Sequence, residues 1–454
     1  MKQTLIKNGY ILSMNGKRQI FDGGDILVAG DTLKAVGKVP AEMISQDAEV
    51  IDAQGKIVMP GLINTHVHLS QQLGRGLGDD VPLLTWLHDR IWPYESAMDL
   101  EDSYVSSLAC CAELIRSGVT TFAEPGGQEV DGMARAVGEI GIRGILARST
   151  MDCGEGLPEK WVETTDEALE KQVAHIEQWH GKADGRIRVW FGLRTIFNCT
   201  DELMVRTKAL ADKYSVGIHM HVAEISEEVR FAEADRGDTT VAHLANLGVL
   251  GPNLLAVHTV WMTPKEIDLF KLYDVKVSHN PGAAMRVLGF APVREMIEHG
   301  IAVSIGTDGA PSNNRMDMFD EMYLTALIHK GRHLVPDALP AEKILEMATV
   351  DGARALLWED EIGSLTPGKK ADLILVDPVS MGSLPLHDKV SNLVYAMHAS
   401  NVESVMCNGS WLMREGKLTT IDEKALMARV QTQADALRKK AGITLPDRFP
   451  VIKC

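Results

Sequence analysis

The sequence predicts an α/β protein, a (β/α)8 TIM barrel beside a small composite β-sandwich domain built from both chain ends. Two patterns predict this class: strand-like and helical runs alternate through the centre, and β-rich stretches lie before and after it. The length of 454 residues suits one large barrel with appendages. We expect a composite sandwich of residues 1–60 and 363–420, a barrel of residues 61–362, and a C-terminal helix and tail of residues 421–454.

The chain begins with short apolar and β-branched runs separated by Asn-Gly, Gly-Gly, Gly-Asp and Gln-Gly turn signals. Similar runs return near the end, with a turn at Asn408-Gly409. Each group is too small for a good core, so we expect both to pack into one sheet domain. The runs are Thr4–Leu12, Asp25–Ala29, Thr32–Val36, Glu49–Asp52, Ala371–Asp377 and Val402–Trp411.

Eight strand-like runs separated by helical segments predict the barrel. Helix starts are indicated at Asp201 and Thr263, where a capping side chain precedes carboxylates in the first turn. The strand runs are Gly61–His68, Val119–Pro125, Gly141–Arg148, Ile187–Arg194, Gly217–Glu224, Leu254–His258, Val275–Asn280 and Ile301–Asp308. The expected helices are Met98–Ser117, Thr165–Gly181, Asp201–Tyr214, Thr239–Leu247, Pro264–Leu272 and, on the surface or against a partner subunit, Asp422–Lys440.

Composition excludes several classes of protein. Hydrophobic residues make up 45% and charged residues 24% of the chain, as in soluble globular proteins. The net charge of −16 argues against nucleic acid and against anionic membrane surfaces as partners. The six cysteines lack C-x-x-C spacing and are interpreted as reduced thiols. Because the N-terminus lacks a signal-peptide core, we expect a cytoplasmic protein.

The ends of the strand runs carry residues that bind metals. Catalytic groups of a parallel barrel lie at the carboxyl ends of its strands, so these residues predict one site at the mouth. Unrelated core histidines are the alternative, which is disfavoured because histidines recur at four of the eight runs and an aspartate ends a fifth. The residues are His66, His68, His219, His221, His258, His279 and Asp308.

Imidazole nitrogen and carboxylate oxygen suit a borderline metal such as Zn²⁺, and three His with one Asp would leave a position for water. The metal would lower the pKa of that water to roughly 7. Glu224, three residues beyond His221, is placed to accept the proton. Spacing alone leaves both His219 and His221 open as ligands, because they share a strand face.

The segments around these residues together resemble the amidohydrolase superfamily, and within it the one-metal deaminase and chlorohydrolase branch. The resemblance implies that His66, His68, His221 and Asp308 bind one metal, with His219 packed beneath. It also implies that Glu224, His258 and Asp308 are catalytic, Glu224 as proton shuttle and His258 as a hydrogen-bond partner of the attacking hydroxide or the developing tetrahedral centre. The matching segments are 58–68, 221–224, 257–258, 278–281, 306–314 and 368–373.

Within that branch the chain is similar to methylthioadenosine and S-adenosylhomocysteine deaminases and to triazine hydrolases. This likeness makes Glu95, Arg148, Arg194 and His279 the candidate substrate-binding residues. Arg194 departs from the pattern, because adenosine-type enzymes carry a histidine there and two-metal members a lysine. A guanidinium offers only donors and a fixed charge, so we expect a substrate with an acceptor-rich or anionic edge, provided Arg194 faces the pocket.

The resemblance implies hydrolytic deamination of an amino-substituted N-heterocycle, such as an aminopurine or adenosine-type nucleoside, a pterin or a pyrimidine, with release of ammonia. A triazine-type hydrolase or chlorohydrolase using the same site is the alternative, and a non-catalytic barrel scaffold is a remote one. We expect zinc as the cofactor, with iron as the alternative. The expected partners are a small heterocyclic substrate and further copies of the chain in a homo-oligomer, with neither nucleic acid nor membrane.

Overall fold

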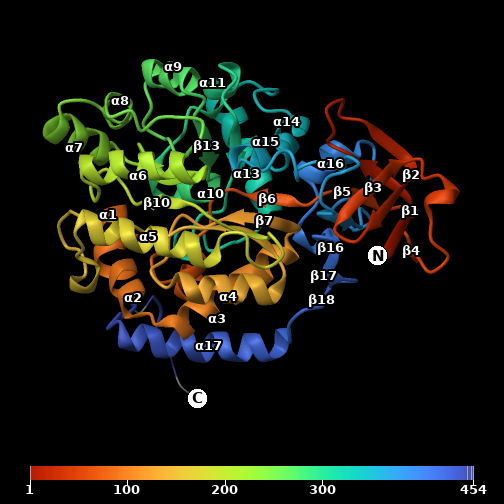
Figure 1. Cartoon of the computed structure of the whole chain (residues 1–454), viewed down its shortest axis with the longest axis horizontal. Helices are drawn as coiled ribbons and strands as arrows, with labels where there is room; N and C mark the ends of the chain where they lie inside the picture. The colour runs from red at the N-terminus through yellow and green to blue at the C-terminus, as the bar shows by residue number, and fades with distance from the viewer. Residues whose placement is uncertain (1, 447, 451, 453–454) are drawn as a thin grey trace.

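The small domain is one sheet made from the two ends of the chain (Figure 1). In the computed structural model, which describes residues 2–446, 448–450 and 452, its strands follow the order β18-β17-β16-β15-β5-β1-β2-β3, with β4 beside β1. Buried apolar side chains such as Ile26, Val58 and Leu373 form its core. The strands are β1 (Gln3–Leu12), β2 (Ile20–Ala29), β3 (Thr32–Gly37), β4 (Glu49–Asp52), β5 (Ile57–Pro60), β15 (Leu373–Val376), β16 (Val402–Cys407), β17 (Ser410–Arg414) and β18 (Lys417–Leu418).

The centre of the chain forms the barrel, which confirms the predicted fold class. Its parallel strands fall into two groups, β6-β7-β8-β9 and β10-β11-β12-β13-β14. Trp190 separates β9 from β10 and links the two groups. Its N–H donates to the Leu146 carbonyl oxygen in the first group, and the Phe191 N–H donates to the Gly217 carbonyl oxygen just before β11 in the second. At the opposite seam the Thr65 N–H donates to Ile305. The strands are β6 (Leu62–Asn64), β7 (Val119–Ala123), β8 (Arg143–Leu146), β9 (Ile187–Val189), β10 (Phe191–Leu193), β11 (Ile218–Val222), β12 (Leu254–His258), β13 (Lys276–His279) and β14 (Val303–Ile305).

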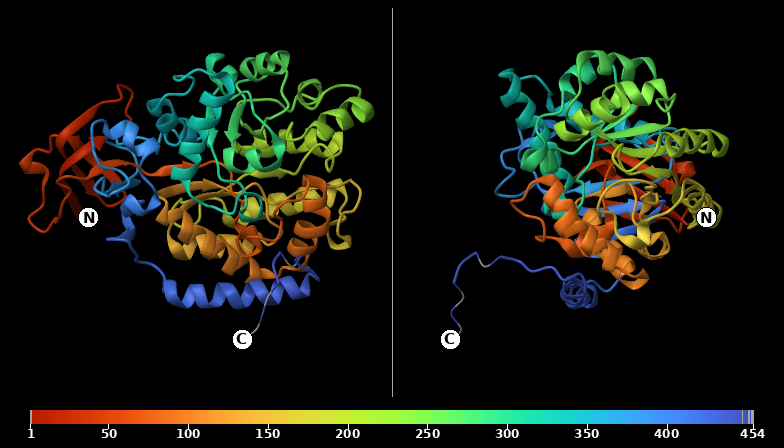
Figure 2. Two further views of the ribbon diagram at one scale, coloured as in Figure 1. Left: turned by 180° about the vertical axis from the view of Figure 1, so that it is seen from behind. Right: turned by 90° about the vertical axis from the view of Figure 1, so that its left-hand side faces the viewer.

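Helices surround these strands, as the two views in Figure 2 show. The expected cap at Thr263 is a capping box, because its side chain accepts the Glu266 N–H and its own N–H donates to Glu266. The helices are α1 (Leu83–Trp86), α2 (Trp92–Ala97), α3 (Leu100–Arg116), α4 (Val130–Ile140), α5 (Thr165–Trp179), α6 (Asp201–Tyr214), α7 (Ser226–Arg236), α8 (Thr240–Asn246), α9 (Pro264–Leu272), α10 (Pro281–Ala283), α11 (Val293–Glu298), α12 (Ala310–Asn313), α13 (Met318–His333), α14 (Ala341–Met347), α15 (Val350–Ala355), α16 (Lys389–Tyr395) and α17 (Glu423–Lys440).

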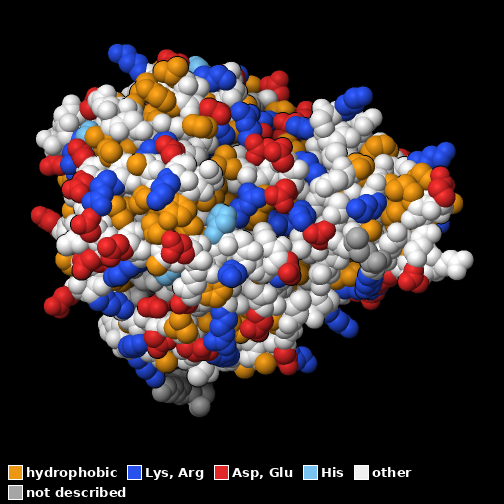
Figure 3. Space-filling model, viewed as in Figure 1, with side chains coloured by type: hydrophobic (Ala, Val, Ile, Leu, Met, Phe, Trp, Pro, Cys, Tyr) orange, Lys and Arg blue, Asp and Glu red, His pale blue; other side chains and the backbone are white. Residues whose placement is uncertain are grey.

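The C-terminal helix α17 lies along the outside of α3. Arg116 of α3 forms an ion pair with Glu423, and Gln433 donates to Asp102. On the face shown in Figure 3, acidic and basic side chains are interspersed. Among the described residues, no helix is both long and apolar enough to cross a membrane.

Candidate active site

Four imidazoles and one carboxylate converge at the mouth of the barrel. The ring of His66 lies 5.0 Å from those of His68 and His221 and 5.4 Å from that of His258, between centroids. Asp308 Oδ1 is 3.4 Å from His66 Nε2 and 3.6 Å from His68 Nε2. Residues more than 200 positions apart in the chain thus form one buried cluster.

The backbone leaves the strands sharply at this cluster. The strand β6 ends at Asn64, so His66 and His68 lie beyond it and not within the strand that the sequence predicts. Ala223, His258 and Asp308 adopt φ values of 51°, 70° and 62°. Such left-handed conformations are costly for residues other than glycine and concentrate at functional sites.

Hydrogen bonds on the far side of two rings fix which nitrogen carries the proton. His221 Nδ1 lies 3.0 Å from the Arg194 carbonyl oxygen, so Nδ1 donates and Nε2 keeps its lone pair. His258 Nδ1 instead lies 3.2 Å from the amide nitrogen of Asn280, which donates to it. Burial lowers the pKa of His258 to about 3 and that of His221 well below its usual value, so both rings are neutral. His221 therefore presents a lone pair to the cluster, whereas His258 presents an N–H.

The donor set fits a divalent metal. His66 Nδ1 lies 3.0 Å from His219 Nε2, while His66 Nε2 is buried without a hydrogen-bond partner among the described residues. A buried lone pair of this kind is unfavourable unless something coordinates it. Burial alone would raise the pKa of Asp308, but the surrounding imidazoles of His66, His68 and His258 hold it well below its usual range. Imidazole nitrogens together with an ionised carboxylate are ligands that zinc prefers.

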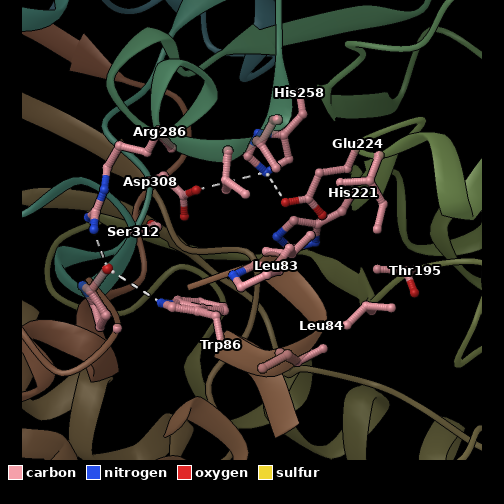
Figure 4. Close-up of a pocket in the computed structure, with 18 of the residues that line it drawn as sticks. Leu83, Leu84, Trp86, Thr195, His221, Glu224, His258, Arg286, Asp308 and Ser312 are labelled. Atoms are coloured by element: carbon pink, nitrogen blue, oxygen red, sulfur yellow. Dashed lines mark hydrogen bonds and ion pairs between the residues drawn. The ribbon is translucent and has the colours of Figure 1, made fainter. Parts of the chain in front are cut away.

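Glu224 borders the same cluster. Its Oε1 lies 3.5 Å from His258 Nε2 (Figure 4). Burial raises the pKa of Glu224 to about 8, and the Asp308 and Glu228 carboxylates add to the rise. Glu228 of α7 also holds the loop, because it accepts the N–H groups of Ala223 at 2.7 Å and Glu224 at 2.9 Å. Glu224 can therefore carry a proton at neutral pH.

The cluster opens into a cavity of about 460 Å³. In Figure 4, Leu84 and Trp86 lie across the cavity from His258 and Glu224. The inner end is therefore polar and ionisable, and the outer wall is largely apolar, which suits a flat heterocycle. The apolar lining residues are Val81, Pro82, Leu83, Leu84, Trp86, Leu87, Phe197, Ile225, Ala283, Val287, Leu288 and Pro311.

Of the four predicted substrate-binding residues, only Arg194 lines this cavity. Glu95 accepts a hydrogen bond from Gln71 at 2.9 Å, and burial raises its pKa. Arg148 forms two hydrogen bonds with Glu163, at 2.8 and 2.6 Å, and His279 Nε2 faces His329 Nε2 at 3.3 Å. The structure thus gives these three side chains protein partners outside the cavity lining.

Sequence reasoning missed two carboxylates that support the site. Glu124 follows β7, accepts the N–H groups of Leu69 and Gly126, and lies 3.8 Å from His68 Nδ1. It is the second-last residue of the predicted run Val119–Pro125, so the rule that singled out the histidines could have found it. Glu228 carries no such signal, because its role depends on how α7 folds back toward Ala223.

Comparison with known proteins places these observations in a family. Residues 57–412 match the amidohydrolase family. The chain is 38% identical over 437 residues to a 5'-deoxyadenosine deaminase of Methanobrevibacter smithii, covering 96% of this chain and 98% of that one. It is also 38% identical over 434 residues to a 5-methylthioadenosine/S-adenosylhomocysteine deaminase of Thermoanaerobacter pseudethanolicus, covering 95% and 99% of the two chains.

Solved structures are similar over the same extent. An adenosine deaminase from Xanthomonas campestris with bound zinc superposes with a TM-score of 0.91 at 31% identity, covering 96% of this chain and 99% of that one. An atrazine chlorohydrolase from Arthrobacter aurescens complexed with zinc gives a TM-score of 0.89 at 25% identity, covering 95% and 100%.

Proposed function

The chain belongs to the amidohydrolase family, and we propose that it is a metal-dependent deaminase that hydrolyses the exocyclic amine of a nitrogen heterocycle and releases ammonia. The observation that carries this proposal is Glu224, a buried acid with a pKa of about 8, beside the N–H of His258 and the histidine–aspartate cluster. Deamination needs a group that accepts a proton from water and returns it to the substrate, which such an acid can do at neutral pH.

We propose His66, His68, His221 and Asp308 as the ligands of one divalent metal, most simply zinc. Their support is the unpartnered Nε2 of His66, the free lone pair of His221 and the ionised Asp308 between them. His258 is left out of this ligand set because Asn280 donates to its Nδ1, which puts a proton on the nitrogen facing the cluster. When bound, the metal would activate water as a nucleophile at neutral pH.

The chain's own residues then divide the proton transfers. Glu224 accepts a proton from the attacking water and delivers it to the ring nitrogen beside the reacting carbon. The N–H of His258 donates to the oxygen that adds to that carbon, which stabilises its developing negative charge. Glu224 then takes the remaining proton from the added hydroxyl and passes it to the amine, so that the C–N bond breaks, a carbonyl forms at the carbon and ammonia leaves. Glu228 keeps Glu224 in place by binding its backbone.

The relatives favour an amine leaving group. The two deaminases are 38% identical to this chain, compared with 25% for the atrazine chlorohydrolase. The apolar wall of the cavity also suits a flat amino-heterocycle. Chloride release by the same groups remains the second candidate, and a halide assay separates it.

The test is ammonia and halide release from a panel of aminopurines, nucleosides, pterins, pyrimidines and chlorotriazines, with metal content measured on the same samples. Glu224→Gln should retain the metal and lose roughly 10²- to 10⁴-fold in kcat. The matched control is Glu227→Gln, which removes an exposed carboxylate three residues further along, in the first turn of α7, and should stay within about twofold of the wild type. Full activity in the Glu224→Gln protein, or ammonia release by wild-type protein that contains no metal, would contradict the proposal.

A further inference from the structure

The cavity contains a guanidinium group that the protein leaves without a partner. Arg194 follows β10, lines the cavity and is 9% exposed. Its hydrogen bonds come from the backbone: its N–H donates to Thr150 and its carbonyl oxygen accepts from His221. No side chain or carbonyl among the described residues accepts from the guanidinium.

Two other arginines, Arg286 and Arg148, have acceptors within the protein for their guanidinium groups. Arg286 also lines the cavity, but it donates to the Pro311 carbonyl at 3.2 Å and forms an ion pair with Asp79 at 2.5 Å. Arg148 binds both oxygens of Glu163. A guanidinium has five donors and a permanent charge, and that of Arg194 faces the cavity without an acceptor among the described residues. A ligand that carries acceptors would supply the missing partners.

The position of Arg194 shows which part of a ligand it can reach. Its carbonyl oxygen holds the ring of His221, so the side chain starts at the inner, polar end of the cavity. Burial raises the pKa of both Glu95 and Glu224, and the positive charge of Arg194 opposes the rise at each. The charge therefore acts close to the proposed proton shuttle, where the reacting ring must lie, and not at the apolar outer wall.

On the basis of the deaminase activity proposed above, we propose that Arg194 selects amino-heterocycles whose ring also carries a carbonyl oxygen beside a ring nitrogen. A planar guanidinium contacts such an adjacent acceptor pair with two parallel N–H groups. The preferred substrate is then an amino-oxo ring, rather than a ring on which the amine is the sole exocyclic polar group. Lysine would supply the charge without the paired geometry.

The test uses matched substrate pairs that differ by one oxo group: adenine with isoguanine, 2-aminopyrimidine with isocytosine, and 2-aminopteridine with pterin. For each pair kcat/KM is measured by ammonia release in the wild type and in Arg194→Met, Arg194→Lys and Arg194→His. Arg294→Met, which removes a partly exposed arginine of α11 outside the cavity lining, is the charge control. A second arm measures Kd for the same pairs by calorimetry in Glu224→Gln and in Glu224→Gln with Arg194→Met, where turnover does not interfere.

We expect the wild type to favour the oxo member of at least one pair, and Arg194→Met to reduce that preference by about 10- to 100-fold, mainly through KM and Kd. Arg194→Lys should keep part of the preference and Arg294→Met all of it. Equal use of both members, or a preference that Arg194→Met leaves unchanged, overturns the inference. If no ring releases ammonia, the proposed function fails, and the Kd arm still decides the role of Arg194. If Arg194→Met lacks a melting transition, Arg194→Lys and Arg194→His supply the comparison.

Discussion

Arg143 joins the barrel to the small sheet, and its replacement by methionine should destabilise the protein strongly. Arg143 lies on β8, and its Nε and Nη2 donate to the two Asp372 oxygens at 2.8 and 3.2 Å. Asp372, which precedes β15, also accepts the Asn408 N–H at 2.6 Å. The two side chains are only 1% and 3% exposed.

The size of the effect follows from this burial. Removing the guanidinium would leave the Asp372 charge in the interior with one backbone donor, and breaking such a pair costs about 3–5 kcal/mol. With roughly 2 cal/mol/K of unfolding entropy per residue, a chain of 454 residues that unfolds as one unit would lose about 3–5 °C in Tm.

The assay is thermal unfolding of the metal-loaded protein by calorimetry. The double variant Arg143→Met with Asp372→Asn should recover at least half of the loss, because Asn keeps an oxygen for the Asn408 N–H without the charge. Arg206→Met removes an exposed ion pair with Glu202 and should leave the Tm essentially unchanged, because solvent screens such pairs. A Tm for Arg143→Met within 1 °C of the wild type, or a double variant no better than the single one, would refute the reasoning.

Three further predictions concern the site and its surroundings. Glu228→Ala should lower kcat by roughly 10-fold with metal content unchanged, because the Glu224 backbone loses its acceptor; an unchanged kcat would contradict this. Removing the metal with a chelator should lower Tm by several degrees, and added Zn²⁺ should restore it; a Tm indifferent to both would count against the ligand set. Burial lowers the pKa of His329 from 6.5 to about 4, so the unfolded chain binds more protons and stability is lost as pH falls through this window. In chelator-treated protein, lowering the pH from 7 to 5 should therefore reduce the Tm of His329→Gln by less than that of the wild type. An equal reduction in both proteins would contradict this role of His329.

The sequence predicted the barrel and the convergence of its polar strand ends because both follow from local pattern and topology. Apolar runs that lead into His66, His221 or Asp308 can be recognised in the sequence, and a parallel barrel brings the carboxyl ends of all its strands to one mouth. The division of the fourth strand at Trp190 was not predicted, since its apolar pattern continues through the interruption.

The partners of individual side chains could not be predicted. Arg148 binds Glu163, which lies 15 residues further along the chain, and neither residue belongs to a periodic pattern that would indicate the contact. The proton positions on His221 and His258 depend on a carbonyl and an amide from other strands. The resemblance predicted roles for Glu95, Arg148 and His279 from their residue types alone, without information on which side chains they contact.

The position of β5 has a consequence for how the protein is made. This buried strand runs directly into the segment that carries His66 and His68, and its two neighbours are β1 and β15. Its partner β15 begins at residue 373, so about 310 residues leave the ribosome after β5 before that pairing can form. At ordinary rates of translation this takes roughly 15 s to 1 min. A nascent chain thus carries an apolar strand edge at residues 57–60 that stays open to other strands throughout that interval.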